Sequence, residues 1–351
     1  MISRQLFDSV SCTYTYLIAS RPGGEALLID SVVENVDRYI KLIEELDLKL
    51  VKAVDTHVHA DHVTGMGELR DRTSCVTVMG ATADVDVVSM RVDEGDKIDI
   101  EGISLDVIYT PGHTNDSYSF LWGDKLFTGD TLLIRGTGRT DFQNGSPEDA
   151  YDSLFNKLLK LPDETVVYPG HDYKGDTVSS IGEERAFNPR LQVSSAQEYA
   201  DIMNNLGLPN PKMMDVAVPA NLQVGLKDVA PEIEERTLPP NEALNRHGMS
   251  DAIFIDLREQ SEREKSGVIP GSVHVPYQRL ADYKKDGGLL SALSAQTGQQ
   301  LLLYCAYGER SALALKDLRG SGFRNLRHLG GGIDAWINAG GPIERLAAET
   351  N

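Results

Sequence analysis

The feature that most constrains this chain is the stretch at residues 56–62, which reads Thr-His-Val-His-Ala-Asp-His. It follows an apolar run at residues 50–54 that predicts a β-strand, so the stretch is expected in the loop after that strand. Three imidazoles and a carboxylate this close together fit neither one face of a helix nor one face of a strand. They converge if the loop turns tightly around an ion, because imidazole and carboxylate groups are ligands for iron and zinc. The stretch therefore predicts a metal site rather than a solvated polar loop.

Three more candidate ligands each come soon after a predicted strand and beside a glycine. They are His113 after residues 104–109, Asp130 after residues 125–129 and His171 after residues 165–167. A glycine at such a position lets the backbone come close to a bound group. With the loop residues His57, His59, Asp61 and His62, the chain offers seven ligands, enough for two metal ions. Ligand number alone thus favours a dinuclear site, in which two zinc ions sharing a hydroxide would make the protein a hydrolase.

Length and composition limit the classes of protein to consider. A chain of 351 residues is expected to form two domains. Its formal charge of −19 argues against nucleic acid and anionic membranes as partners. No apolar run is long enough to cross a bilayer and no signal peptide begins the chain, so we expect a cytoplasmic protein. The three cysteines fit reduced thiols, and Cys12 is expected to be a small buried residue at a strand start.

Composition shifts along the chain predict its domain organisation. Strands and helices alternate through most of residues 1–226, which indicates an α/β domain. Residues 227–236 are acidic and poor in large apolar side chains, so we expect a linker there. Residues 237–351 start a second alternation, with apolar strands predicted at residues 252–258 and 300–304. Apolar strands separated by helices predict a second α/β domain, built on a parallel sheet covered on both faces.

The motifs of the first region resemble the metallo-β-lactamase fold. They are THxHxDH at residues 56–62, PGHT at 111–114, TGD at 128–130 and PGHDY at 169–173. The resemblance implies a four-layer αββα sandwich with its metal site at one edge of the two sheets. Further stretches are similar to the persulfide dioxygenase family, and this similarity covers nearly all of residues 1–225. These stretches are RGTGRTDFQ at residues 135–143, FNPRL at 187–191 and DVAVPAN at 215–221.

The likeness to persulfide dioxygenases implies a different metal site from the one that ligand number suggests. It implies a single Fe(II) held by His57, His113 and Asp130, a two-histidine, one-carboxylate set that leaves positions open for substrate sulfur and O₂. Zinc has no accessible redox change and would not activate O₂. The other candidates would then orient ligands and waters from outside the coordination sphere. These are His59, Asp61, His62 and His171.

The same likeness implies a reaction and the residues that bind its substrate. The reaction is oxidation of glutathione persulfide by O₂ and water to sulfite and glutathione. Arg139 and Tyr173 are implied to hold the glutathione part, because an arginine grips a carboxylate through two hydrogen bonds. Lys174 and Arg190 are weaker candidates. The family often forms homodimers, and the sequence leaves the oligomeric state open.

A second candidate site lies at residues 305–311, which read CAYGERS. A cysteine at a strand end, followed by a tight loop and a helix start, is an arrangement that stabilises a thiolate. The loop resembles the CxxGxR(S/T) loop of rhodaneses, and the likeness covers about residues 237–351. It implies that Cys305 carries a persulfide, while the loop amides and Arg310 bind thiosulfate or sulfite.

The two resemblances support each other, because both concern persulfides and sulfite. We therefore interpret the chain as a persulfide dioxygenase fused to a rhodanese sulfurtransferase. One alternative is a dinuclear zinc hydrolase of glutathione thioesters, of the glyoxalase II type, with a sulfur-carrier domain. Another is a sulfur carrier without oxidase activity, in which Cys305 is the only reactive residue. The direction of sulfur transfer and any channelling between the sites are left open.

Overall fold

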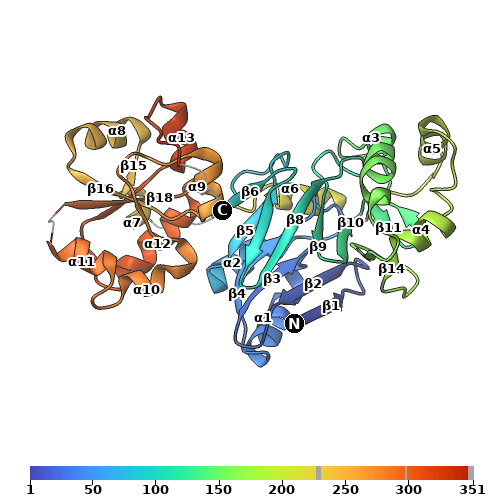
Figure 1. The fold of residues 1–351 in the computed structure, drawn as a ribbon, viewed down its shortest axis with the longest axis horizontal. Helices are drawn as coiled ribbons and strands as arrows, with labels where there is room; N and C mark the ends of the chain where they lie inside the picture. The colour runs from blue at the N-terminus through green and yellow to red at the C-terminus, as the bar shows by residue number, and fades with distance from the viewer. Residues whose placement is uncertain (227–230, 297–298, 347–351) are drawn as a thin grey trace. The chain divides into compact units, whose positions relative to one another are not determined.

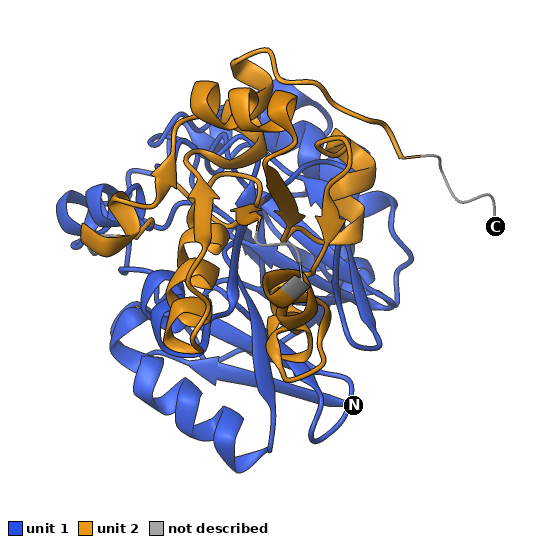
Figure 2. Ribbon diagram, turned by 90° about the vertical axis from the view of Figure 1, so that its left-hand side faces the viewer, with its two compact units in different colours: residues 1–86, 91–224 blue, residues 87–90, 225–351 orange. Residues whose placement is uncertain are grey.

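The computed structural model describes residues 1–226, 231–296 and 299–346. Within it the chain divides into two compact units, coloured separately in Figure 2. The first unit comprises residues 1–86 and 91–224, and the second comprises residues 87–90 and 225–351. In the described part of the chain, no helix has both the length and the apolar character that a membrane span requires.

The first unit contains two six-stranded sheets (Figure 1). One sheet has the order β1 (Ile2–Phe7), β2 (Tyr14–Ala19), β3 (Glu25–Ile29), β4 (Lys49–Val54), β5 (Val76–Gly80) and β6 (Met90–Val92). The other has the order β14 (Ser179–Ser180), β13 (Val166–Pro169), β10 (Lys125–Gly129), β9 (Tyr118–Trp122), β8 (Ile103–Tyr109) and β7 (Lys97–Ile100). A small hairpin, β11 (Leu132–Leu133) with β12 (Gly136–Thr137), follows β10.

Aromatic side chains join the two sheets. The ring of Tyr16, from β2, lies 5.0 Å from the ring of Phe127 and 5.6 Å from that of Tyr168, both centroid to centroid. Its hydroxyl donates a hydrogen bond of 2.6 Å to the carbonyl of Pro169. Such a ring brings a large apolar area into the core while its polar end is satisfied. These contacts fix the strand ends of the second sheet against β2.

Helices cover the outer face of each sheet. The first sheet is covered by α1 (Val36–Glu45), which follows a short turn η1 (Val33–Asn35), and by α2 (Met66–Thr73). A common hydrophobic core joins the second sheet to the helices that cover it. These helices are α3 (Pro147–Asp152), η2 (Ser153–Lys157), η3 (Leu158–Lys160), α4 (Ile181–Phe187) and α5 (Ala196–Met203). Serines 146, 180 and 195 begin α3, α4 and α5 by accepting a backbone N–H of the first turn. The predicted αββα sandwich is confirmed.

The second unit is built on a five-stranded sheet in which every neighbouring pair is parallel. Its order is β15 (Thr237–Leu238), β19 (Leu326–Leu329), β18 (Gln300–Tyr304), β16 (Ala252–Asp256) and β17 (Val273–His274). The connecting helices include α8 (Pro240–Met249), α9 (Gln260–Ser266), α10 (Leu280–Lys284), α11 (Leu289–Gln296), α12 (Glu309–Gly320) and α13 (Gly332–Asn338). Phe254 and Trp336 pack edge to face in its core. The predicted parallel sheet is confirmed.

Two details of the chain differ from expectation. Part of the predicted linker, residues 227–230, lies outside the described residues, but Pro231–Glu234 forms helix α7 with Ile233 buried. Thr237 donates to the carbonyl of Ile233 at 2.9 Å, so this part of the linker packs as structure of the second unit. Cys12 is not a buried strand residue: it is half-buried, in the turn before β2, with a left-handed φ of 64°.

The close approach of the two sheets at Gly80 gives a test of the fold. An alanine Cβ at Gly80 would lie 2.0 Å from the ring of Tyr118, which is fully buried and has no room to move. We expect Gly80→Ala to lower the free energy of unfolding by about 1 to 3 kcal/mol, because overpacking strains the core. Urea denaturation of the full chain, followed by hydrogen exchange in β5 and β9, measures the loss.

The matched control is Gly67→Ala in α2, where a Cβ meets no atom closer than 3.4 Å. Alanine favours a helix over glycine, so this variant should be at least as stable as the natural chain. Equal losses in both variants would contradict the packing of the two sheets described here.

Candidate functional site

The candidate metal ligands of the first unit lie at one edge of its two sheets. The loop with residues 55–62 follows β4 of the first sheet. His113, Asp130 and His171 follow β8, β10 and β13 of the second sheet, and these three strands run in the same direction. The sequence therefore brings all of these side chains to the same edge.

His57, His113 and Asp130 form a group able to hold a metal ion. One ligand atom from each lies within 4.8 Å of the other two. The rings of His57 and His113 are 5.0 Å apart, centroid to centroid, and His113 Nε2 lies 3.6 Å from Asp130 Oδ2. All three side chains are buried or nearly so. The structure thus brings together the three residues that the sequence resemblance implied.

Hydrogen bonds leave one nitrogen of each histidine available. Thr56 Oγ1 donates its proton to Asp30 Oδ2 at 2.9 Å. It therefore accepts the hydrogen bond from His57 Nδ1, which also lies 2.9 Å away. His113 Nδ1 donates to the carbonyl of Arg139 at 2.7 Å. In both rings Nε2 therefore carries the free lone pair that a metal requires.

The charge states suit a metal as well. Burial lowers the pKa of His57 well below its usual range, and the neighbouring His59 and His113 lower it further, so the ring is neutral. Burial opposes ionisation of Asp130, but His171 and then His113 lower the pKa of its carboxyl below the usual range. Two imidazoles and one carboxylate, buried together, are a donor set that fits a single divalent iron.

Within the described residues, His171 belongs to none of the groups of side chains that could hold a metal ion. His171 Nδ1 lies 2.6 Å from Asp130 Oδ1, and its Nε2 lies 2.8 Å from Asp61 Oδ2. Although burial opposes a charged ring, these two carboxylates raise the pKa of His171 well above its usual range. Among the described residues two further metal-capable groups exist, and neither contains His171: His59, Asp61 and His62, and Asp30, Asp55 and His59.

His59 is itself held by a buried carboxylate. Its Nε2 lies 3.2 Å from Asp30 Oδ1, and this pairing raises the pKa of the His59 ring to about 9 although burial opposes the charge. His59 Nδ1 and His62 Nε2 are buried and have no hydrogen-bond partner within the described residues. Both atoms are therefore free to take a ligand or a water.

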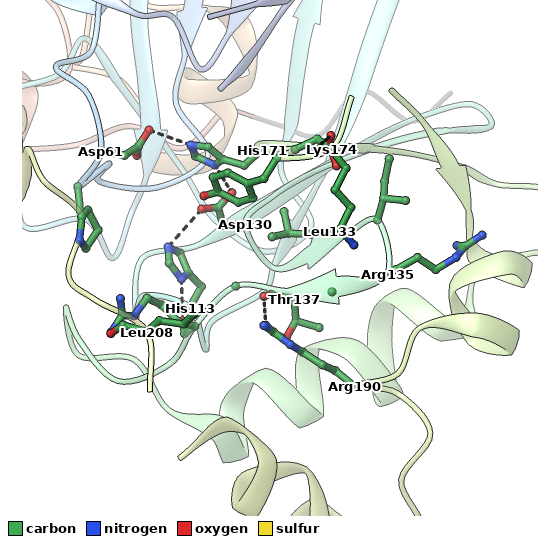
Figure 3. A pocket seen from close by; sticks show the side chains of 18 of the residues that line it. Asp61, His113, Asp130, Leu133, Arg135, Thr137, His171, Lys174, Arg190 and Leu208 are labelled. Carbon is green, nitrogen blue, oxygen red and sulfur yellow. Dashed lines mark hydrogen bonds and ion pairs between the residues drawn. The ribbon is translucent and has the colours of Figure 1, made fainter. Parts of the chain in front are cut away.

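A cavity of about 270 Å³ opens over the metal group (Figure 3). Its inner wall includes His113, Asp130 and His171. In a chain of charge −19, the charged residues in the rest of the wall are basic apart from Asp61 and Asp172. The basic lining residues are Arg135, Arg139, Lys174 and Arg190. The cavity can therefore bind an anionic ligand beside the metal group.

The two residues predicted to hold glutathione both line this cavity. Tyr173 is 71% exposed, and its ring stacks on His171 with centroids 6.1 Å apart. Arg139 pairs with Asp141 through Nε at 2.6 Å and Nη2 at 2.7 Å. It also donates to the carbonyls of Leu208 and Pro209. Much of its guanidinium thus holds the cavity wall together, and its contact with substrate stays a prediction.

Cys305 lies at the C-terminal end of β18, directly before the loop that starts α12. The thiol is buried, and the N–H of Gly308 points at Sγ from 3.2 Å. Gly308 has φ of 97°, a backbone conformation that favours glycine and that turns this N–H inward. Ser311 Oγ lies 3.8 Å from Sγ. The loop therefore directs one backbone donor, the Gly308 N–H, at the sulfur, while the Ser311 hydroxyl donates to the Gly308 carbonyl.

Arg310 is fully buried behind this loop. Its Nη1 and Nη2 donate to the two carboxylate oxygens of Glu262 at 2.7 and 2.5 Å, which anchors α12 to α9. Its Nε has no partner in the described part of the chain. Arg310 thus supports the loop, and a direct contact with thiosulfate or sulfite stays a prediction.

Sequence reasoning missed two polar residues beside these sites. Thr13 places its hydroxyl between Asp61 and His171. His328 lies 3.2 Å through Nδ1 from Ser311 Oγ, and burial lowers the pKa of its ring to about 4. Neither residue belongs to a motif, and each reaches its site only through the pairing of distant segments.

Comparison with known proteins agrees with this architecture. The family model for the metallo-beta-lactamase superfamily matches residues 12–171. The model for the rhodanese-like domain matches residues 239–339. A metallo-beta-lactamase from Staphylococcus aureus shares the fold, with a TM-score of 0.60 at 21% identity over 93% of this chain and 98% of that one.

Closer relatives cover the first unit. The mitochondrial persulfide dioxygenases ETHE1 of Mus musculus and Homo sapiens are each 46% identical over 234 residues, which is 65% of this chain and 90% of each relative. The crystal structure of ETHE1 from Myxococcus xanthus is 54% identical, with a TM-score of 0.62 over 63% of this chain and 98% of that one. This chain therefore belongs to the persulfide dioxygenase family and carries, after that region, a rhodanese-like domain.

Proposed function

We propose that the protein oxidises glutathione persulfide with O₂ and transfers sulfur through Cys305. The observation that carries the first activity is the group of His57, His113 and Asp130 beside a cavity lined by four basic side chains. The family to which the chain belongs supports the same activity. The overall reaction balances as persulfide plus O₂ plus water giving the thiol, sulfite and two protons.

The residues of the first unit would have separate roles in the oxidation. His57, His113 and Asp130 would hold one Fe(II), which supplies the unpaired electrons that O₂ activation requires. His171 keeps Asp130 ionised and turned toward the site through the bond between Nδ1 and Oδ1. The basic side chains of the cavity would bind the carboxylates of glutathione, and Tyr173 would cover its entrance. The cavity thus orients the persulfide sulfur toward the metal group.

At Cys305 the proposed reaction is transfer of one sulfur atom. The thiolate attacks the outer sulfur of thiosulfate, an S–S bond forms to Sγ, and sulfite leaves with the electron pair of the broken bond. A glutathione thiolate then takes the outer sulfur and returns Cys305 to a thiolate. The Gly308 N–H would stabilise the charge on Sγ in both steps. In this direction the product, glutathione persulfide, is the substrate of the first site.

The alternative of a dinuclear zinc hydrolase is not favoured. The relatives that match the first unit are persulfide dioxygenases, and His171, one of the seven possible ligands, lies between two carboxylates. A homodimer and a cytoplasmic location both stay predictions. The first rests on the family, and the second rests on the sequence, whose three cysteines fit reduced thiols.

We likewise propose that the dioxygenase domain ends near residue 226, because the second compact unit begins at residue 225 and α7 packs with it.

Separate substitutions should separate the two activities. His113→Ala removes a proposed ligand and is expected to lower O₂ uptake on glutathione persulfide by at least about 100-fold. Substitution of a group that only orients a metal ligand already lowers activity or metal affinity by about 10- to 100-fold. Its thiosulfate–glutathione sulfur transfer should be unchanged. Cys305→Ser should show the reverse pattern. The measurement is an oxygen-electrode assay beside a sulfite-release assay, and loss of both activities in either variant would contradict two independent sites.

Arg139 offers a test of the cavity. Lysine cannot reproduce its paired bonds to Asp141, so Arg139→Lys should raise KM for glutathione persulfide about 10-fold with little change in kcat. Steady-state O₂ uptake gives both constants. The control is Arg21→Lys, where the arginine makes a similar pair with Glu101 on the exposed surface. A fall in kcat with unchanged KM would contradict a binding role.

A further inference from the structure

Thr13 occupies a central place beside the metal group. Its side chain is fully buried, although it comes from the turn before β2. Its hydroxyl donates to Asp61 Oδ2 at 3.0 Å, and it lies 3.0 Å from His171 Nε2 and 3.3 Å from His62 Nδ1. It therefore touches three of the four candidate ligands that lie outside the group of His57, His113 and Asp130.

These contacts, with that of Asp130, engage Asp61 Oδ2 and both ring nitrogens of His171. Asp61 Oδ2 faces three donors, because His62 Nδ1 lies at 2.9 Å and His171 Nε2 at 2.8 Å in addition to the Thr13 hydroxyl. A carboxylate oxygen with three hydrogen-bond donors has no lone pair left for a cation. His171 likewise uses both ring nitrogens in hydrogen bonds. Of the ring nitrogens of His62 and His171, only His62 Nε2 remains without a hydrogen-bond partner among the described residues.

The backbone holds Thr13 in this place. Thr13 forms an isolated antiparallel bridge with His171, and Tyr14 N–H donates to the carbonyl of Gly170 at 2.8 Å. Asp172 N–H donates to the carbonyl of Cys12 at 3.2 Å. Cys12 itself has the left-handed φ of 64°, which costs a non-glycine residue energy and persists only where the surroundings enforce it. The turn is thus built to present the Thr13 hydroxyl to His171.

We propose that the Thr13 hydroxyl keeps the site mononuclear, by holding Asp61 and His171 in hydrogen bonds that a second metal ion would have to break. This inference rests on the proposed function, since it takes the first ion to be held by His57, His113 and Asp130. Thr13 is a positioning residue: it acts on the metal through Asp61 and His171. It explains why a chain with seven potential ligands takes one ion.

The test is metal stoichiometry. Thr13→Val keeps the shape of the side chain and removes its hydroxyl, and with it one of the three hydrogen bonds at Asp61 Oδ2. The full chain is loaded anaerobically with Fe(II), incubated with Zn²⁺, desalted and analysed for both metals by mass spectrometry. We expect the natural chain to hold one ion and Thr13→Val to hold two. Adding His62→Ala to Thr13→Val should return the number to one, because His62 Nε2 would be a ligand of the extra ion.

Two controls accompany this test. Thr13→Ser retains the hydroxyl and should hold one ion. Thr15→Val removes a buried hydroxyl nearby that bonds to the Asp30 carbonyl and to Tyr39, and it should also hold one ion. A thermal melt of each loaded variant shows that it is folded, and Thr13→Ser keeps the comparison valid if Thr13→Val is less stable.

The other outcomes are also decisive. A single ion in Thr13→Val, a second ion in Thr13→Ser, or no metal in Thr13→Val would each overturn the proposal while leaving the proposed function intact. Two ions in the natural chain would overturn the mononuclear site itself, and with it the proposed oxidation.

Discussion

Each oxygen of the Asp130 carboxylate faces a different imidazole, and the proposed chemistry of the first unit depends on this arrangement. Oδ1 lies against His171 Nδ1 at 2.6 Å, while Oδ2 faces His113 Nε2 at 3.6 Å. A buried charge is tolerated only when it is paired, so Asp130 and His171 hold each other in place. Because Asp61 takes the other nitrogen of His171, His171 belongs to none of the metal-capable groups of the described residues, and Asp130 is grouped with His57 and His113.

The two units concern the same sulfur compounds. Sulfur transfer from thiosulfate to glutathione at Cys305 yields sulfite and glutathione persulfide. Oxidation of that persulfide yields a second sulfite and regenerates glutathione. Together the two steps turn thiosulfate, O₂ and water into two sulfites and two protons, with glutathione as a carrier. On the proposed function, one chain would hold both halves of a balanced reaction, which would give a physical reason for joining them.

Local sequence patterns predicted much of the fold and of the candidate site. The apolar runs before His113, Asp130 and His171 predicted strands, and their ends do meet at one edge because β8, β10 and β13 run in the same direction. The cysteine loop was predictable for a similar reason, since strand, tight turn and helix follow one another directly in the chain.

Other features depend on contacts between distant segments and had no local signal. Thr13 reaches the site because its backbone pairs with His171, and His328 reaches Ser311 because β19 lies beside β18. The hydrogen-bonded ion pair between Arg310 and Glu262 likewise depends on the packing of α12 against α9. The number of metal ions is the clearest case. Seven ligands suggested two ions, and only the hydrogen bonds of His171 show that one of those ligands is already engaged.

The most direct test of this account is metal analysis of the full-length chain purified without oxygen, combined with O₂ uptake on glutathione persulfide. We expect close to one iron per chain, and O₂ consumption that disappears when zinc replaces the iron. Two zinc ions per chain with no O₂ consumption would contradict the account, and sulfur transfer at Cys305 would then be the only part of the proposed chemistry left.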